Sequence, residues 1–342
     1  MIARPTIRDL AEVAGVSVAT VNRVLSGAEG VREPTREKVR AAAEQISFYG
    51  LGAIQSRNAA VQPKFHFGAL LLQPHRPFYK LLAQALSAAA ASADADIELK
   101  IEHLEDLSPE NTAARALALA ETCQAICLTT AVHPTVMQAV ETIQSSGVQV
   151  FALISQLAAT GQVHYIGLDN WKVGRTAAWA FAKMCPAPGK LGILMGNHRY
   201  RNQEMNETGF RSYFREHAPE FVLLEPLPTF ESSAVAHEMT ESLLSKHPDL
   251  AGLYVAGGGI SGALAALRGS GRAGKLIVVG YELMDTTRGA LLDGTLTLAI
   301  AHPLKQLAKA AVSGMVGAVS AGSDPVNFTS VIPFELYTPE NI

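Results

Sequence analysis

The sequence predicts two kinds of structure in one chain: an all-α N-terminal head, followed by a larger α/β domain of two lobes with parallel sheets. Between Thr6 and Phe48, apolar residues recur at helical spacing and a single glycine interrupts them. From Phe65 onwards, short and almost wholly apolar runs alternate with amphipathic segments of helical length. That alternation is typical of parallel sheets covered by helices on both faces.

We expect three short helices in the head. Thr6 stands at an N-cap position, and Asp9 completes a capping-box pattern. Gly15 ends the first helix where the backbone needs a positive φ. Ser17 can cap the second helix, and Pro34-Thr35 opens a third that runs to about Ile46. A helix, a glycine turn and a second helix form the helix-turn-helix layout, in which the second helix lies in the DNA major groove.

A helical bundle without nucleic acid is the alternative, but it has no need of a second helix rich in Ser, Thr, Asn and Arg. Such donors suit phosphate oxygens and base edges. We expect Val18 and Ala19 to face thymine methyl groups and Arg23 to reach guanine. The other expected contacts, chiefly to phosphate or sugar, come from Thr6, Ser17, Thr20 and Asn22.

This segment resembles the DNA-binding headpiece of the lactose-repressor (LacI/GalR) family of bacterial regulators. The matching stretches are IRDLAEVAGVSVATVNRVLSG and VREPTREKVRAAAEQISF. The resemblance implies a hinge helix that wedges a leucine into the minor groove. Here Gly50-Leu51 replaces the usual Pro-Asn pair, and Arg57 stands at the wedge position. The sequence leaves open whether Ile54, Leu51 or Arg57 enters the groove, or whether the segment is a plain linker.

Composition and charge agree with this division. The 342 residues are 48% hydrophobic and 17% charged, which indicates a globular chain. Residues 1–57 hold eight Lys or Arg against six Asp or Glu, a net charge of +2, whereas the remainder carries −5. We therefore expect the DNA contact to be confined to the head. The predicted parts are a headpiece with hinge (1–57), a linker (58–64) and a two-lobed effector-binding and dimerisation domain (65–342).

The body is expected to follow a regular order. The first lobe (about 65–165 and 297–323) has strands at 65–73, 96–104, 125–131 and 148–155, and a crossing strand near 163–168 leads to the second lobe. The second lobe (about 170–292) has strands at 190–196, 221–230, 250–257 and 275–282. A strand at 296–303 then crosses back, and one closing strand lies near Val331–Leu336. Helices fill the intervals, the last at Leu304–Ala321.

A ligand site is expected between the lobes, because ligands of open parallel sheets lie beyond the carboxyl ends of the strands. Two such lobes resemble the periplasmic sugar-binding-protein (type I) fold that the family uses to bind effectors. The resemblance implies that Phe78 and Tyr79 stack on a sugar and that Glu282 replaces an aspartate that accepts sugar hydroxyls. Gly257-Gly258 departs from the family's frequent Asn-Asp pair. The full predicted effector set is Gln73, Arg76, Phe78, Tyr79, Ser155, Gln156, Arg201, Asn202, Glu204, Glu282 and His302.

Two patterns in the sequence raise the alternatives of nucleotide binding and acid–base catalysis. Residues 257–262 fit the GxGxxG pattern, with Glu282 further on, but the pattern falls late in the α/β region rather than in its first turn. His198 with Glu204, or His302 with Glu282, could form an acid–base pair, yet no GxSxG, HExxH or P-loop pattern supports an enzyme. Cys123, Cys127 and Cys185 form no CxxC pattern, so we expect free thiols and neither metal nor cofactor.

The sequence thus predicts a transcriptional regulator, a repressor, that binds double-stranded DNA and responds to a small sugar-like metabolite. We expect a homodimer on a pseudo-palindromic operator, with contacts along the outer helices of the first lobe. Without a signal-peptide pattern or an apolar run of membrane length, a cytoplasmic location is expected. The alternatives are a sugar-sensing binding protein with a non-functional head and a nucleotide-dependent enzyme. Effector identity, induction or co-repression, and dimer or tetramer stay open.

Overall fold

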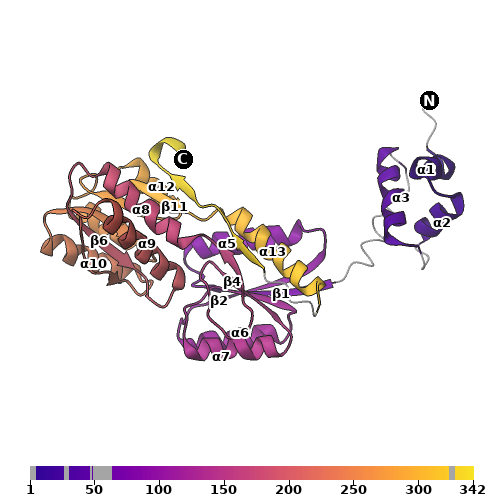
Figure 1. Ribbon diagram of the computed structural model, residues 1–342, viewed down its shortest axis with the longest axis horizontal. Helices are drawn as coiled ribbons and strands as arrows, with labels where there is room; N and C mark the ends of the chain where they lie inside the picture. Colours follow the sequence, from indigo (N-terminus) through magenta and orange to yellow (C-terminus); the bar gives the residue numbers. More distant parts are fainter. Residues whose placement is uncertain (1–4, 27–30, 47, 49–63, 323–327) are drawn as a thin grey trace. The chain divides into compact units, whose positions relative to one another are not determined.

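The computed structural model describes residues 5–26, 31–46, 48, 64–322 and 328–342 (Figure 1). The chain divides into two compact units, one ending at Lys64 and the other beginning at Phe65. The hinge candidates Leu51, Ile54 and Arg57 lie outside the described residues. So does the predicted linker except for Lys64, which begins a strand rather than ending a linker.

The head has the three predicted helices, α1 (Ile7–Ala14), α2 (Val18–Ser26) and α3 (Glu33–Gln45). The capping box is formed: the Thr6 amide donates to Asp9 Oδ2 at 2.7 Å, and the Asp9 amide donates to Thr6 Oγ1 at 3.3 Å. Gly15 follows α1 with a φ of +64°, the left-handed conformation that favours glycine. Leu10, Val21 and Val39 are fully buried where the three helices meet.

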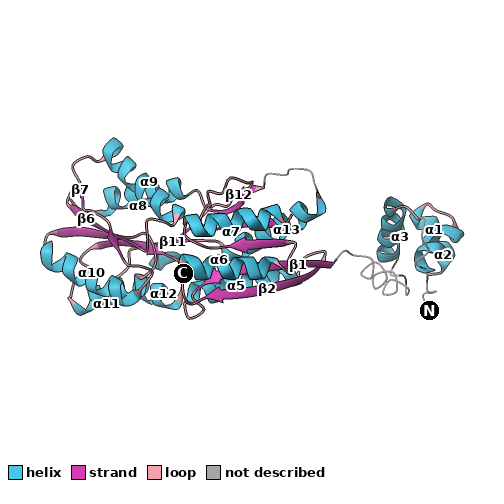
Figure 2. Cartoon of the chain, turned by 90° about the horizontal axis from the view of Figure 1, so that it is seen from below, coloured by secondary structure: helices cyan, strands magenta, loops and turns pink. Residues whose placement is uncertain are grey.

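The first lobe is built on a six-stranded sheet with the order β12-β5-β4-β3-β1-β2. Helices α5 and α13 pack together on one face, and α6 and α7 on the other (Figures 1 and 2). The strands are β1 (Lys64–Leu72), β2 (Asp96–Leu104), β3 (Ala125–Leu128), β4 (Gln149–Leu153), β5 (His164–Gly167) and β12 (Thr329–Val331). The helices are α5 (Pro77–Ala91), α6 (Pro109–Ala120), α7 (Pro134–Ser145) and α13 (Leu304–Ser320).

The second lobe repeats the plan, with the order β13-β11-β10-β9-β6-β7 and β8 also paired with β6. Helices α8 and α9 pack as one pair, and α10 and α11 as another. The strands are β6 (Lys190–Met195), β7 (Val222–Leu223), β8 (Leu227–Pro228), β9 (Leu250–Val255), β10 (Ile277–Tyr281), β11 (Leu298–Ala301) and β13 (Glu335–Tyr337). The helices are α8 (Asn170–Met184), α9 (Arg201–His217), α10 (Ser233–Lys246), α11 (Ile260–Gly269), α12 (Asp285–Leu292) and the 3-10 turn η1 (Pro339–Asn341).

Most predicted elements are confirmed, and three expectations are corrected. The strand expected at 221–230 is split into β7 and β8, and Pro226, which has no amide hydrogen to donate to a ladder, lies between them. The expected strand at 296–303 is β11, which pairs with β10 in the second sheet. Residues 298–301 therefore belong to the second lobe, and the chain crosses back to the first lobe after β11. The expected closing strand is two strands in different sheets, separated by Pro333.

The chain therefore passes between the lobes three times: after β5, between β11 and α13, and between β12 and β13. Each lobe has its own apolar core. In the second, Tyr254 stacks on Phe210 with ring centroids 4.7 Å apart, and Phe181 meets Phe210 edge-on. None of the helices in the described part of the chain is both long and apolar enough to cross a membrane.

Candidate functional site

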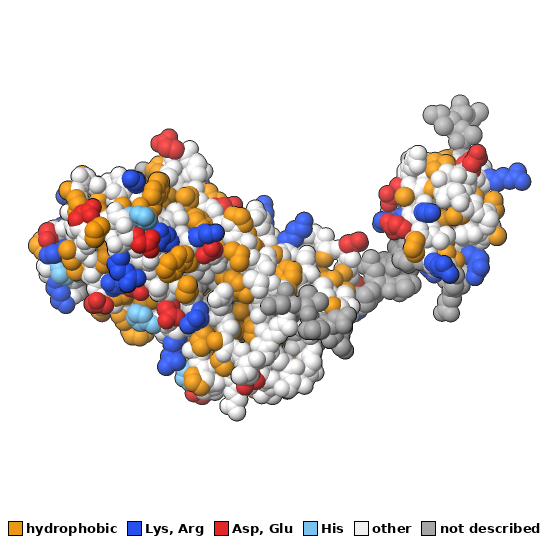
Figure 3. All heavy atoms as spheres, in the orientation of Figure 1, with side chains coloured by type: hydrophobic (Ala, Val, Ile, Leu, Met, Phe, Trp, Pro, Cys, Tyr) orange, Lys and Arg blue, Asp and Glu red, His pale blue; other side chains and the backbone are white. Residues whose placement is uncertain are grey.

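Helix α2 presents its polar side chains to solvent and its apolar ones to the core. Ser17, Ala19, Asn22 and Arg23 are exposed, and Thr20 is half-buried. Val18 is 40% exposed, although it is apolar. On the opposite side of the helix, Val21 and Val24 are buried. Figure 3 shows both Lys or Arg and Asp or Glu side chains on the visible face of the head, and Arg23 is the basic residue of α2.

Two residues predicted to contact DNA, Ser17 and Thr6, also form hydrogen bonds at the starts of helices. Ser17 Oγ accepts from the Thr20 amide at 3.1 Å, and the two hydroxyl oxygens lie 2.8 Å apart. The Thr6 hydroxyl donates to Asp9 Oδ2 at 2.8 Å while it caps α1. These bonds fix where α1 and α2 begin. They leave Asn22, Arg23 and the two small apolar residues as the exposed groups without a capping role.

In the body, the predicted effector residues come from strand ends of both lobes. Gln73, Arg76, Phe78 and Tyr79 follow β1, and Ser155 follows β4. On the second lobe, Asn202 lies in the first turn of α9, and Glu282 and His302 follow β10 and β11. We call the residues that meet across the lobes the interlobe site, and its centre is formed by Arg76, Phe78, Glu231, Glu282 and His302.

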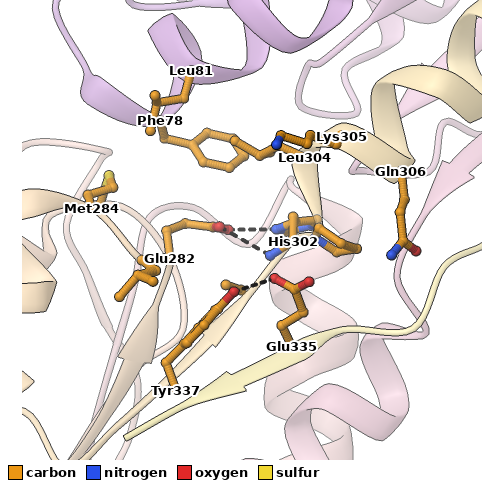
Figure 4. Close-up of a pocket in the computed structure, with 13 residues that line it drawn as sticks. Phe78, Leu81, Glu282, Met284, His302, Leu304, Lys305, Gln306, Glu335 and Tyr337 are labelled. Atoms are coloured by element: carbon orange, nitrogen blue, oxygen red, sulfur yellow. Dashed lines mark hydrogen bonds and ion pairs between the residues drawn. The ribbon is translucent and has the colours of Figure 1, made fainter. Parts of the chain in front are cut away.

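Glu282 and His302 form a pair at this site (Figure 4). Glu282 has a φ of +67°, and its Oε1 lies 2.6 Å from His302 Nδ1. Its other oxygen accepts from the His302 amide at 3.2 Å. His302 is only 6% exposed, and its Nε2 is buried with no partner among the described residues. The pair that the sequence offered as an acid–base couple is therefore formed, with one imidazole nitrogen left for a ligand.

Aromatic rings border the same pair. The Phe78 ring lies 5.8 Å from the His302 ring and 5.1 Å from that of Tyr79. Phe78, Glu282 and His302 line a hollow of about 370 Å³ that also reaches the start of α13 and the strand β13. Figure 4 shows Phe78 above the pair, and Glu335 with Tyr337 below it. The hollow thus has walls from both lobes.

A second pair joins the lobes directly, and sequence reasoning missed half of it. Arg76 Nη1 donates to Glu231 Oε2 at 2.5 Å, with side chains 20% and 7% exposed. Arg76 belongs to the first lobe and Glu231 to the loop after β8. Burial opposes the charge on Arg76, but the Glu231 carboxylate outweighs burial and raises the pKa of Arg76. Glu231 could have been found by the rule for strand ends, had the expected strand at 221–230 been followed to its next residue.

Tyr79 lies near enough to both pairs for their charges to act on it. Burial, and then the negative charges of Glu231 and Glu282 among its neighbours, raise the pKa of Tyr79 well above its ordinary value. Its hydroxyl therefore stays neutral. Tyr200 is also buried beside Glu231, and burial raises its pKa in the same way. Neutral hydroxyls can both donate and accept, which suits a polyhydroxyl ligand.

Buried polar atoms that follow strand ends of both lobes have no hydrogen-bond partner within the described residues. They are Thr129 Oγ1, Ser155 Oγ, Asn202 Oδ1 and His302 Nε2. Thr129 follows β3, Ser155 follows β4, Asn202 lies in the first turn of the helix after β6, and His302 follows β11. The buried side chain of Tyr281 instead interacts with those of Asn206 and Tyr254 inside the second lobe. Buried polar groups without partners are costly, so such a group at a strand end is explained by a ligand or by water.

Other predicted effector residues do not join this group. Gln156 is exposed, and Arg201 pairs with Glu204 at 3.2 Å, with each side chain about half exposed. Gln73 reaches Arg76 only at 3.5 Å. The ion pair with Arg201 also gives Glu204 a partner other than His198, its proposed acid–base partner. In place of these residues, the structure adds Gln203 and Glu231, both of which are buried.

The glycine-rich loop is arranged around a protein carboxylate. The Gly258 amide donates to Glu231 Oε1 at 3.4 Å, and Gly259 caps α11 with a φ of +100°. In a nucleotide-binding loop such amides face a phosphate. Here Glu231 stands in that place, and its negative charge would repel a phosphate. This arrangement disfavours the nucleotide alternative.

The cysteines are free thiols, with Cys123 and Cys127 buried and Cys185 half-buried. Burial raises the pKa of all three. Among the described residues, no cluster of three or more His, Cys, Asp or Glu could hold a metal ion.

Comparisons with known proteins agree with both units. Residues 73–323 match the model of the periplasmic binding protein domain, and residues 6–50 match that of the bacterial regulatory proteins of the lacI family. The fold and the site thus define a two-lobed domain of the periplasmic-binding-protein type, preceded in the chain by a helix-turn-helix head. Over most of its length the chain belongs to the periplasmic binding protein domain family, and its head matches the lacI family of bacterial regulatory proteins.

Individual relatives are similar mainly to the body. A D-apiose import binding protein of Paraburkholderia graminis is 24% identical over 304 residues, which cover 88% of this chain and 94% of the relative. A D-ribose/D-allose-binding protein of Pseudomonas aeruginosa is 32% identical over 48% of this chain and 50% of its own length. Among solved structures, a solute binding protein of Burkholderia graminis in complex with D-arabinose has a TM-score of 0.75 at 19% identity, covering 81% of this chain and 96% of that one. That likeness shows the fold.

Proposed function

We propose that this protein is a sequence-specific transcriptional regulator, a repressor, whose binding to operator DNA is controlled by a small sugar-like effector held at the interlobe site. The observation that carries the effector half of the proposal is the set of buried polar atoms without partners at the strand ends of both lobes. A ligand rich in hydroxyl groups would satisfy them. Phe78 supplies an apolar ring beside them, the usual partner of a sugar's carbon face.

The DNA-binding half rests on α2. Its exposed Asn22 and Arg23, beside small apolar Val18 and Ala19, offer hydrogen-bond donors and methyl contacts on a helix held by a three-helix core. A head that had lost its function would have no reason to keep this set exposed. The relatives named above are sugar-binding proteins, which supports a sugar as the effector here.

The effector can change DNA binding only if it binds one arrangement of the lobes more tightly than another. We propose that closure on the ligand alters the spacing of two heads in a homodimer bound to a pseudo-palindromic operator. The outer helices of the first lobe are the proposed dimer contact. A regulator of this kind acts on the chromosome, so we place it in the cytoplasm. Both matched families are binding families, and we assign the protein no catalysis.

The test is recovery and sequencing of genomic DNA fragments bound by the purified full chain, with and without D-ribose, D-allose or D-apiose. We expect one enriched pseudo-palindrome, whose recovery changes when the effector is present. If no fragment is enriched at low salt with or without sugar, while one of the sugars binds to the folded protein, the head is non-functional. The protein would then be a sugar-sensing binding protein, and the proposed regulator would be wrong.

A further inference from the structure

Two glycines make room for the Glu231 carboxylate at the interlobe site, and a third makes room for the Gln203 amide that holds it. A Cβ added to Gly258 would lie 1.9 Å from Glu231 Oε2, and one added to Gly196 would lie 1.7 Å from Glu231 Oε1. A Cβ on Gly257 would lie 2.4 Å from Gln203 Oε1. No side chain fits at these positions because Glu231 and Gln203 already fill them. The polar groups of Gln203 and Glu231, which belong to other segments of the chain, therefore occupy the places that side chains at 257 and 258 would take.

The Glu231 carboxylate is fixed from within the second lobe. Gln203 Nε2 donates to its Oε1 at 2.7 Å, and the Gly258 amide donates to the same oxygen at 3.4 Å. Gln203 is itself held, since its Oε1 accepts from the amides of Gly196 at 2.6 Å and Asn197 at 3.1 Å. The acid is thus positioned before any ligand arrives.

The backbone around Glu231 is also unusual. Phe230 and Glu231 have φ values of +51° and +59°, and two consecutive non-glycine residues rarely adopt this conformation. The bend turns Phe230 outward, where it is 64% exposed, and turns Glu231 inward. Such strain persists where the surrounding structure over-determines it, commonly at binding sites.

The charges of the interlobe site are already balanced or acidic. Among the described residues that form its centre, Arg76 is the one arginine or lysine, and Glu231 compensates it at 2.5 Å. The other acid of the centre, Glu282, faces His302. Lys305 lines the adjoining hollow, but so do the acids Glu282 and Glu335. An anionic ligand would have to take Arg76 from Glu231 and leave a buried carboxylate without its cation, which is strongly unfavourable. A neutral sugar can accept from the other guanidinium N–H groups and donate to free carboxylate lone pairs.

We propose that Glu231 is a specificity-determining residue of the interlobe site, which together with Arg76 selects an uncharged polyhydroxyl ligand over a sugar phosphate or a sugar acid. The inference rests on the proposed function, because it names the ligand class for the same site. Glu231 takes the acidic role that residues 257 and 258 cannot fill. Its bond to Arg76 also links the lobes before the ligand binds.

The first test is isothermal titration calorimetry with D-ribose, D-allose and D-apiose, each beside its aldonate and its terminal phosphate. We expect the wild-type chain to bind a neutral sugar at least about tenfold more tightly than its anionic forms, since a hydrogen bond to a charged group is at stake. Glu231→Gln keeps the shape and removes the charge. It should weaken the neutral sugar about tenfold and strengthen the anionic forms, because Arg76 is freed. Glu241→Gln, an exposed acid on α10, is the control that should change neither.

The second test needs no ligand. Thermal midpoints of Arg76→Gln, Glu231→Gln and the double variant form a double-mutant cycle. Each single variant leaves a buried charge unpaired, so each should lower the midpoint more than the double variant does. Additive midpoint losses would show that the pair does not link the lobes, and the inference would be wrong.

The outcomes separate this inference from the proposed function. If a neutral sugar binds and changes DNA binding but Glu231→Gln alters neither affinity nor the order of ligands, the specificity role of Glu231 fails and the regulator stands. Preference of the wild-type chain for an anionic form has the same meaning. If no sugar of either charge binds while the cycle shows coupling, the sugar effector and this ligand assignment both fail.

Discussion

At the scale of the residue, hydrogen-bond partners decide which atoms of the interlobe site face a ligand. The Glu282 carboxylate accepts from His302 Nδ1, so a neutral His302 carries its proton there and leaves Nε2 as an acceptor. Ser155 and Asn202 keep buried polar atoms without partners in the described structure. The chemistry of the site therefore follows from what each side chain has left to offer after its structural bonds are made.

On the head, we expect Arg23→Ala to abolish specific DNA binding and to spare most non-specific binding. Loss of an arginine contact to guanine costs about 1–3 kcal/mol of discrimination. Fluorescence anisotropy with the recovered operator and a scrambled duplex measures the two affinities, and Arg40→Ala on α3 is the control. Equal loss on both duplexes would contradict a base contact for Arg23.

In the body, we expect Phe78→Ala to weaken the response to the effector and to leave effector-free DNA binding unchanged. The ring beside His302 supplies an apolar surface to the ligand, and alanine removes it. Operator binding titrated with the effector measures the response. Phe78→Tyr keeps the ring and should keep most of it, whereas a normal response in Phe78→Ala would remove Phe78 from the site.

Cys127 gives a pH dependence of stability. Burial raises the pKa of its thiol from the ordinary 9.0 to about 12. The folded chain thus holds this proton more tightly than the unfolded chain, so the stabilising contribution is complete below about pH 9 and is lost as the pH rises towards about 12. We expect urea unfolding midpoints to fall more steeply above about pH 9 in the wild type than in Cys127→Ala. Identical slopes would show that this thiol does not contribute.

At the scale of the element, backbone constraints at helix ends and strand ends place the functional groups. Gly15 lets α1 stop and the chain turn so that α2 begins three residues later. In the body, Pro226 and Pro228 shorten the edge strands, and the chain then bends through Phe230 to carry Glu231 into the interlobe site. Pro333 separates β12 from β13. Prolines and positive φ values thus decide where a strand yields to a functional loop.

A matched pair of glycine substitutions tests this at helices. Gly15→Ala should destabilise the head by about 1–2 kcal/mol, because an L-residue is forced into the left-handed conformation. Gly317→Ala, within α13 and with open space around its Cβ position, should instead stabilise by up to about 1 kcal/mol. Hydrogen exchange on the full chain checks both: faster exchange is expected in α1 and α2 for the first, and slower exchange in α13 for the second.

At the scale of the whole molecule, the chain crosses between the two lobes three times, so three segments connect the two sheets. The ion pair of Arg76 with Glu231 is a direct bond between the same lobes. A ligand that binds between the lobes therefore acts on groups that both lobes contribute. Separation of the chain into a DNA-binding head and a ligand-binding body assigns each function to its own unit.

The whole-molecule prediction concerns salt. If a dimer places two heads on DNA with at least six phosphate contacts, affinity should fall about a thousandfold or more as salt rises from about 50 to 200 mM, because bound counterions are released. Filter binding across this range, with sedimentation to fix the oligomeric state, measures the slope. Asn22→Ala removes an uncharged hydrogen-bond donor and no cation, so it should weaken binding at every salt concentration and leave the slope unchanged. A flat salt dependence would be incompatible with a working head.

By itself, the sequence determined the features that depend on neighbouring residues: the capping box of Thr6 and Asp9, the turn at Gly15, and most strands and helices of both lobes. Periodicity, caps and glycine conformations are local, so they are visible in one dimension. Resemblance added the plan of two lobes and the predicted roles of Phe78 and Glu282, and both residues lie beside His302.

Only the tertiary structure decided which residues meet. Glu231 lies 155 positions from Arg76, and its cradle combines Gln203 with glycines from two other strand ends. The sheet membership of β11, β12 and β13 likewise depends on long-range pairing. Such contacts depend on how whole sheets and helices pack together rather than on the conformational propensities of neighbouring residues. The lack of side chains at Gly257 and Gly258 is therefore explained only by the tertiary structure, in which the Gln203 amide and the Glu231 carboxylate occupy their places.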